Sequence, residues 1–115
     1  SSLIQGECAP QKDVFDVVEA LFPGGSVTGC PKKRTMEIID ELEGESRGIY
    51  CGSAGYILDN GDFEFNIMIR TLWLEKGKKG STISFRSGGG IVVDSDPTSE
   101  YEETLHKAQA LLKVL

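Results

Sequence analysis

The chain has 115 residues, of which 39% are hydrophobic and 26% are charged, and this is the composition of one ordinary globular domain. Its formal net charge of −6 argues against nucleic acid or an anionic membrane surface as the partner. No apolar run approaches the length of a membrane span. The three cysteines form no CxxC pair, so we expect neither a zinc site nor a disulfide framework, and a reducing cytoplasmic compartment fits best.

Two helices are expected in the first part of the chain. Apolar residues recur at helical spacing over 13–22, and Pro23 with the two glycines after it ends this helix. A loop at 26–30 follows. Pro31 suits the first position of a second helix, over 31–42, because its missing N–H has no partner to lose there, and Gly44 stops it.

Three strands and a last helix complete the predicted order. The strands are expected at 49–58, 63–74 and 82–93. The dipeptide Asn60-Gly61 predicts a hairpin between the first two. Asp96 and Pro97 are typical of a helix start, so a final helix should run to the C-terminus. The order ααβββα, with an antiparallel three-strand meander, predicts an α+β fold with one core that buries somewhat over 60% of the unfolded surface.

The last helix carries two distinct faces. Its apolar stripe, expected to face the core, consists of Tyr101, Leu105, Ala108, Leu112 and Leu115. Beside it lie Glu100, Glu103 and Lys107. Two carboxylates one turn apart can share Mg²⁺, which prefers oxygen ligands. The alternative is structural, because acids are favourable near a helix N-terminus and Glu103 with Lys107 makes a surface ion pair.

Arg70 and the glycine run at Gly88, Gly89 and Gly90 are candidates for anion binding. Arg70 lies among apolar residues in the middle of a predicted strand, and a guanidinium there needs an anion. That anion could be a ligand carboxylate or a protein acid such as Glu64 or Glu100. The glycines could present N–H groups to an anion, or they could mark a bulge or kink.

Five ordered segments resemble the signatures of the chorismate-utilising enzymes. They are Pro23–Glu43, Arg47–Gly52, Asn66–Thr71, Gly88–Asp94 and Glu100–Glu103. The resemblance extends over essentially the whole chain. It implies an α/β enzyme about four times longer, of which residues 1–115 would be the C-terminal portion of the chorismate-binding domain.

The resemblance also implies a role for each candidate residue. Glu100 and Glu103 would contribute to a Mg²⁺ site that holds a carboxylate of the substrate. The substrate chorismate would be contacted by Tyr50, Arg70 and Lys107, by N–H groups of Gly88, Gly89 and Gly90, and by Ser26 lining the pocket. No catalytic residue is expected within this chain, because the resemblance implies that the nucleophilic lysine of the para-aminobenzoate-type enzymes lies upstream. We therefore expect no turnover by the chain alone, and self-association through apolar surface that a partial domain would leave bare.

Within the family, the segments Gly24–Gly29 and Asp62–Ile67 resemble the para-aminobenzoate branch, the aminodeoxychorismate synthases (component I). That branch replaces the 4-hydroxyl of chorismate by an amine, with ammonia from a glutamine amidotransferase, and feeds folate biosynthesis. Cys30 and Thr35 depart from the family pattern, where alanine is usual. The alternatives are the anthranilate synthase branch, which aminates C2 and expels pyruvate, and a non-catalytic ligand-binding module.

Overall fold

The computed structural model describes residues 3–115 and contains four helices and four short strands. The helices are α1 (Val14–Leu21), α2 (Gly25–Thr28), α3 (Lys32–Glu43) and α4 (Pro97–Leu112). Asp13 caps α1 reciprocally with Asp16, and Gly44 ends α3 in the left-handed conformation at φ 63°. The three predicted helices are thus confirmed. The ends of α1 and α3 lie within one residue of the prediction, whereas α4 ends at Leu112 and not at the C-terminus. Helix α2 is a short addition that overlaps the predicted loop.

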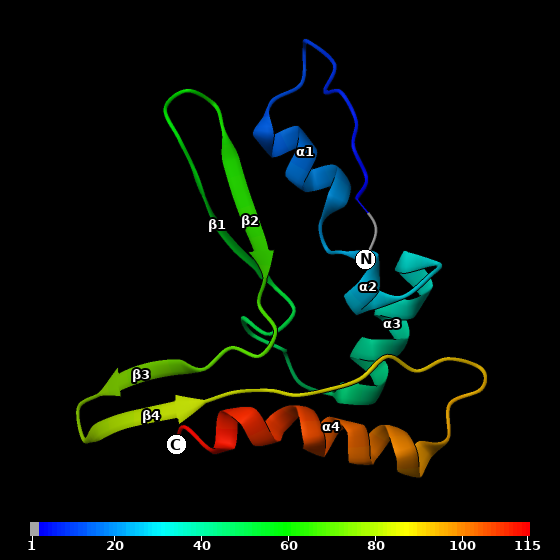
Figure 1. The fold of residues 1–115 in the computed structure, drawn as a ribbon, viewed down its shortest axis with the longest axis vertical. Coiled ribbons are helices and arrows are strands. Elements are labelled where there is room, and N and C mark those ends of the chain that lie inside the picture. The colour runs from blue at the N-terminus through cyan, green and yellow to red at the C-terminus, as the bar shows by residue number, and fades with distance from the viewer. Residues whose placement is uncertain (1–2) are drawn as a thin grey trace.

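The strands form two separate hairpins instead of the predicted three-strand meander. The strands are β1 (Ser53–Ile57), β2 (Phe63–Ile67), β3 (Trp73–Gly77) and β4 (Gly80–Ser84). β1 pairs antiparallel with β2 only, and β3 with β4 only (Figure 1). The α+β class is confirmed, because helices and antiparallel strands occur in separate runs along the chain.

Arg70 is where the predicted strand 63–74 divides. It adopts the left-handed conformation, with φ 51°, which a β-strand does not accommodate. Just before it, the Ile69 N–H donates to the Ile67 carbonyl at 2.9 Å, so the chain turns away from β1. The predicted strand 82–93 is also shorter than expected, because pairing ends at Ser84 and the chain continues without a strand partner.

The elements are spread out and do not enclose a common core. The radius of gyration is 17.2 Å, whereas a compact chain of this length has about 13 Å. The accessible surface is 9685 Å², against about 6,200 Å² for a compact protein of this mass. Among residues 3–115, Ala108 is the one buried apolar residue, and it is still 8% exposed. The prediction of a self-contained core is therefore wrong: α1 and β1–β2 stand at one end, and α4 lies across the other (Figure 1).

The apolar stripe of α4 faces outward, contrary to the prediction. Tyr101 and Leu112 are 65% and 56% exposed, and of the predicted core stripe only Ala108 is buried. The side of α4 that meets the rest of the chain carries Glu100, Thr104 and Lys107, which are half-buried. The physical reason is the neighbour: α4 packs on the small residues 87–89, and that narrow segment covers only one face of the helix.

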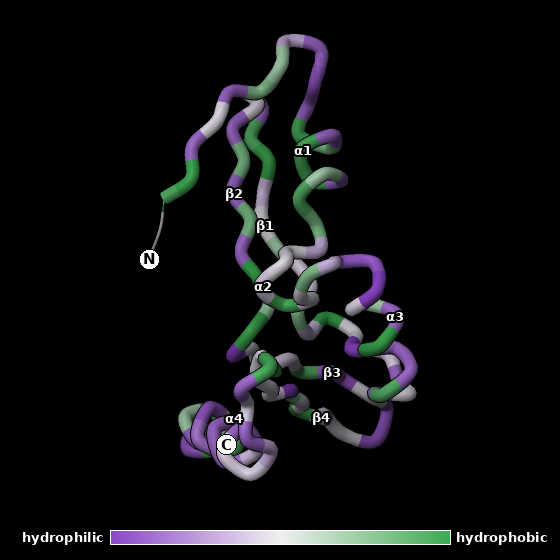
Figure 2. Tube along the Cα trace, turned by 90° about the vertical axis from the view of Figure 1, so that its right-hand side faces the viewer, coloured by the Kyte–Doolittle hydropathy of each residue, from purple (hydrophilic) through white to green (hydrophobic). Residues whose placement is uncertain are grey.

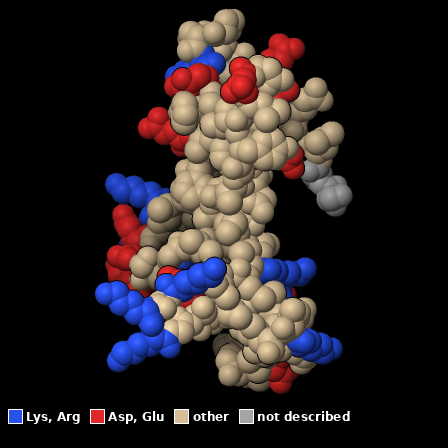
Figure 3. Space-filling model, turned by 90° about the vertical axis from the view of Figure 1, so that its left-hand side faces the viewer, with Lys and Arg blue, Asp and Glu red and all other residues tan. Residues whose placement is uncertain are grey.

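Apolar segments recur along the open chain. Figure 2 shows hydrophobic stretches alternating with hydrophilic ones along α1 and the β1–β2 hairpin. Figure 3 shows one face of the molecule, on which a broad uncharged area separates charged groups at the two ends. No helix among residues 3–115 is long and apolar enough to cross a membrane.

Candidate functional site

A cavity of about 230 Å³ brings together four of the predicted site residues. Its lining consists of Tyr50, Ile69, Arg70, Arg86, Ser87, Gly88, Lys107 and Leu111. These residues come from the turn after α3, the link between the hairpins, the segment after β4, and α4. Three of the eight lining side chains are cationic and none is acidic, so the cavity suits an anion.

Tyr50 is held at this cavity by a tight turn. Its N–H donates to the Arg47 carbonyl at 3.2 Å, and the next residue, Cys51, takes the left-handed conformation at φ 63°. Cys51 and Gly52 then exchange hydrogen bonds with Met68 at 3.0 and 2.9 Å, which ties the turn to the chain just before Arg70. Burial raises the pKa of the Tyr50 phenol, and the nearby Arg47 charge opposes that rise, so the phenol stays a hydrogen-bond donor at neutral pH.

Arg70 has no acidic partner within ion-pairing distance among residues 3–115. The two acids considered as structural partners are engaged elsewhere. Glu64 accepts from the Tyr56 hydroxyl at 2.7 Å, and Glu100 accepts from the Ser95 hydroxyl at 2.5 Å. In the described part of the chain the guanidinium is therefore available to an anion from outside it.

The three glycines differ in their surroundings. A Cβ on Gly88 would lie 2.9 Å from the Tyr50 hydroxyl oxygen, and one on Gly89 would lie 3.3 Å from a Glu100 carboxylate oxygen. A Cβ on Gly90 would meet nothing within 4 Å. Within residues 3–115, none of the three N–H groups donates a hydrogen bond to another protein group, so they can serve an anion. The bulge alternative does not apply, because no strand forms at these positions.

The two glutamates of α4 lie beside this cavity. Glu103 pairs with Lys107 at 2.7 Å, so the ion pair considered as the structural alternative is present. Glu100 is half-buried near Gly89. Two carboxylates suit Mg²⁺, which takes one or two such ligands and keeps several waters. Among the described residues no group of three or more metal-binding side chains occurs, so further ligands would be water, substrate or residues outside this chain.

Ser26 does not join the other predicted residues. It lies exposed on α2 and lines neither the smaller cavity nor the larger hollow described next. Conversely, sequence reasoning missed Arg86, which lines the cavity and pairs with Glu45 at 3.1 Å. The signal was the same as for Arg70, a lone arginine in a predicted strand next to an apolar residue.

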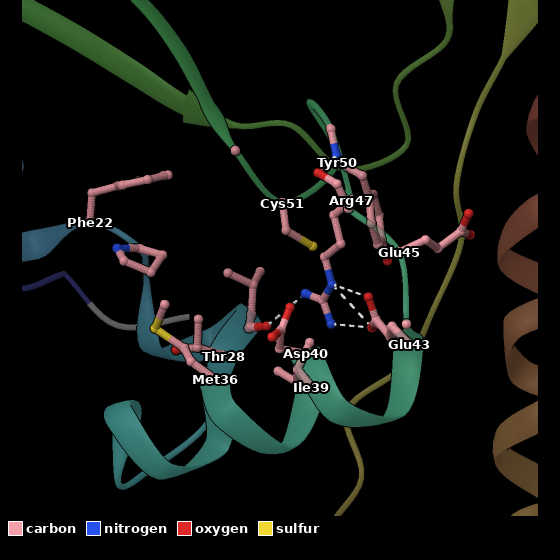
Figure 4. Close-up of a pocket in the computed structure, with 16 residues that line it drawn as sticks. Phe22, Thr28, Met36, Ile39, Asp40, Glu43, Glu45, Arg47, Tyr50 and Cys51 are labelled. Carbon is pink, nitrogen blue, oxygen red and sulfur yellow. Dashed lines mark hydrogen bonds and ion pairs between the residues drawn. The ribbon is translucent and has the colours of Figure 1, made fainter.

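A larger hollow of about 700 Å³ also has Tyr50 in its lining (Figure 4). Apolar side chains from the end of α1 and from α3, including Phe22, Met36 and Ile39, line one part of it, and Arg47 and Glu43 line another. Tyr50 lines both hollows. A change in the position of this side chain therefore alters both hollows.

Known proteins similar to this chain agree on its family. The family model described as "chorismate binding enzyme" matches residues 1–113. Anthranilate synthase component 1 of Haloferax volcanii is 48% identical over 111 residues, which is 96% of this chain and 21% of that protein. Aminodeoxychorismate synthase component 1 of Bacillus subtilis is 46% identical over 114 residues, which is 99% of this chain and 23% of that protein.

A further relative is anthranilate synthase component 1 of Cereibacter sphaeroides, 49% identical over 110 residues, with 96% of this chain and 21% of that protein covered. The chain thus spans about a fifth to a quarter of the length of the curated relatives it matches. Both reaction names occur among them at nearly equal identity. The match over residues 1–113 and the identity across almost the whole chain establish that it belongs to the family of chorismate-binding enzymes.

Proposed function

We propose that this chain forms one wall of a chorismate site, in a protein that acts as component I of aminodeoxychorismate synthase. The observation that carries the proposal is the convergence of Tyr50, Arg70, Gly88 and Lys107 on one cavity, with Arg70 free of any acidic partner in residues 3–115. Chorismate has two carboxylates, and a cationic cavity with free N–H donors suits such a group.

In this proposal each residue has a binding role. Arg70 and the Tyr50 hydroxyl hold the carboxylate of the enolpyruvyl group, and Lys107 binds the substrate on the side of α4. Glu100 and Glu103 would hold Mg²⁺, which when bound supplies positive charge beside the ring carboxylate and the leaving hydroxyl. The chain orients substrate and excludes water, and the covalent step uses residues outside it. In that step ammonia from a glutamine amidotransferase replaces the 4-hydroxyl of chorismate, and water is released.

The proposed branch rests on the segments Gly24–Gly29 and Asp62–Ile67 and on the Bacillus subtilis relative at 46% identity. The relatives at 48% and 49% identity favour a second candidate, anthranilate synthase component I, which forms anthranilate and pyruvate. Both candidates use the same carboxylate-binding residues, so the two reactions are separated by their products.

The test is product analysis with the full-length protein that carries this chain. It is incubated with chorismate, an ammonium salt and Mg²⁺, and the products are separated by mass. We expect 4-amino-4-deoxychorismate and no pyruvate. Anthranilate with stoichiometric pyruvate would replace the first candidate by the second, and absence of both products would favour a non-catalytic binding module. The chain of 115 residues alone should give neither product.

A further inference from the structure

Arg47 lies at the junction of three segments behind the proposed substrate cavity. Its guanidinium binds both oxygens of Glu43, the last residue of α3, with N–O distances of 2.6, 2.8 and 3.1 Å. A second arm donates to the Val27 carbonyl in α2 at 3.3 Å. Figure 4 shows the guanidinium facing the Glu43 carboxylate, among the residues that line the larger hollow.

The same guanidinium lies against the Tyr50 ring. The Arg47 Cζ is 5.8 Å from the ring centroid, within the range of a cation–π contact. The Tyr50 hydroxyl, at the far end of that ring, reaches the Gly88 position at the smaller cavity. Arg47 lines only the larger hollow, so it acts on the cavity through Tyr50 and not through substrate.

We propose that Arg47 is a positioning residue, which holds the Tyr50 ring so that its hydroxyl points into the carboxylate cavity. The inference rests on the proposed function, because Tyr50 matters only where the cavity takes a carboxylate. The Arg47 side chain is 24% exposed and anchored on two helices, so it is a firm support for a ring that lines both hollows. Lysine cannot replace it, since one ammonium cannot bind Glu43 bidentately and reach Val27 as well.

The test is a double-mutant cycle on the KM for chorismate, measured with the full-length protein. Tyr50→Phe removes the hydroxyl and should raise KM about 10-fold. Arg47→Met should raise KM about 5-fold, with kcat changed less than about 2-fold, because the chemical step does not use it. In the Tyr50→Phe background, Arg47→Met should add less than about 2-fold, because both changes remove the same interaction.

Two further variants control for a general structural effect. Arg34→Met removes an arginine of α3, which pairs with Glu37 at 3.1 Å and lines neither hollow, and should leave KM unchanged. Glu43→Gln keeps Arg47 but weakens its anchor, so it should raise KM less than Arg47→Met does, and not at all when Phe replaces Tyr50. This variant decides the matter if Arg47→Met does not fold. Arg47→Lys should not restore the KM.

The outcomes separate the two hypotheses. If Tyr50→Phe leaves KM unchanged, the proposed carboxylate contact is wrong and the positioning role falls with it. Suppose that Tyr50→Phe raises KM, and that Arg47→Met or Glu43→Gln raises it by the same factor with and without Tyr50→Phe. The proposed function then stands and the positioning role is wrong. The positioning role is also wrong if Arg47→Met lowers the melting temperature and kcat without raising KM.

Discussion

Gly88 and Gly90 lie two residues apart, but an alanine at one would meet different surroundings from an alanine at the other. An alanine methyl at Gly88 would sit 2.9 Å from the Tyr50 hydroxyl oxygen, too close for an ordinary contact, whereas at Gly90 it would meet nothing within 4 Å. Neither residue has a positive φ, so the backbone itself accepts alanine at both positions. The difference between the two substitutions is therefore a difference in what the methyl group displaces.

We predict that Gly88→Ala moves the Tyr50 hydroxyl out of the cavity and raises the KM for chorismate about 10-fold, the loss expected for one hydrogen bond to a charged group. Gly90→Ala is the matched control: it keeps the N–H of residue 90, its methyl group meets nothing within 4 Å, and the KM should stay within about 2-fold of the parent. Steady-state kinetics on the full-length protein measure both. Equal effects of the two alanines would contradict the position given to Tyr50.

The sequence predicted residues that line the cavity, but it did not predict how their side chains are paired or supported. An arginine among apolar residues needs an anion, so Arg70 could be found from the sequence. That it has no acidic partner in residues 3–115 could not be found, because this depends on where Glu64 and Glu100 lie in space. Arg47 was missed as a residue of interest, since a turn arginine four residues after a glutamate is typical of a surface ion pair.

At the scale of elements, α4 depends on its N-terminal cap. The Asp96 carboxylate accepts from the backbone N–H and the hydroxyl of Ser99, both at 2.9 Å. The backbone hydrogen bond, then the hydroxyl, lowers the Asp96 pKa below its ordinary value of 3.8. Since α4 carries Glu100, Glu103 and Lys107, this cap sets the start of the helix that supplies three of the candidate residues.

We predict that Asp96→Ala lowers the melting temperature of the full-length protein at neutral pH by about 2 °C. Asp94→Ala, which changes an exposed residue outside the helix, should leave that temperature unchanged. A carboxyl with a lowered pKa in the folded state stabilises above pH 3.8, and that contribution is lost as the pH falls through the lowered pKa. The gap between parent and variant should therefore narrow below that pH. Thermal unfolding followed by circular dichroism at several pH values measures it, and a gap independent of pH would contradict the role of the charge.

The strands were predicted less well than the helices, for a local reason. The alternation of apolar and polar residues over 63–74 correctly indicates extended chain. It carries no information on the left-handed backbone of Arg70, φ 51°, which lies between β2 and β3. The helices were found because their end signals, Pro23, Gly44, Asp96 and Pro97, act within a few residues. The face of α4 that packs inward depends on which segment lies beside it, and helical periodicity cannot supply that.

The described chain exposes more surface than a compact monomer of its mass, and many large apolar side chains contribute to that surface. On the β1–β2 hairpin, Phe63, Phe65 and Ile67 are each about 40% exposed, and the stripe on α4 is bare as well. An exposed patch of this kind is covered in stable proteins, either by more of the same chain or by another molecule. The relatives, which are four to five times longer, have additional chain that could do this.

We predict that the isolated chain of 115 residues self-associates through these hairpin faces or edges, because nothing within residues 3–115 covers them. Light scattering over a range of concentrations should give a mass that rises above the monomer. Phe65→Glu, at the middle of β2, should shift that rise to higher concentration, while Glu75→Gln on β3 should not. A monodisperse monomer at high concentration would contradict the prediction.

Tyr50 lines both hollows, so the position of its ring can link the binding equilibria of the two. Under the proposed function, an occupant of the larger hollow that shifted the ring would change the affinity of the smaller cavity for a carboxylate. Equilibrium linkage then requires that the anion change the occupant's affinity by the same factor. A molecule or segment bound against Arg47 would thus report, through a single aromatic ring, whether the neighbouring cavity is filled.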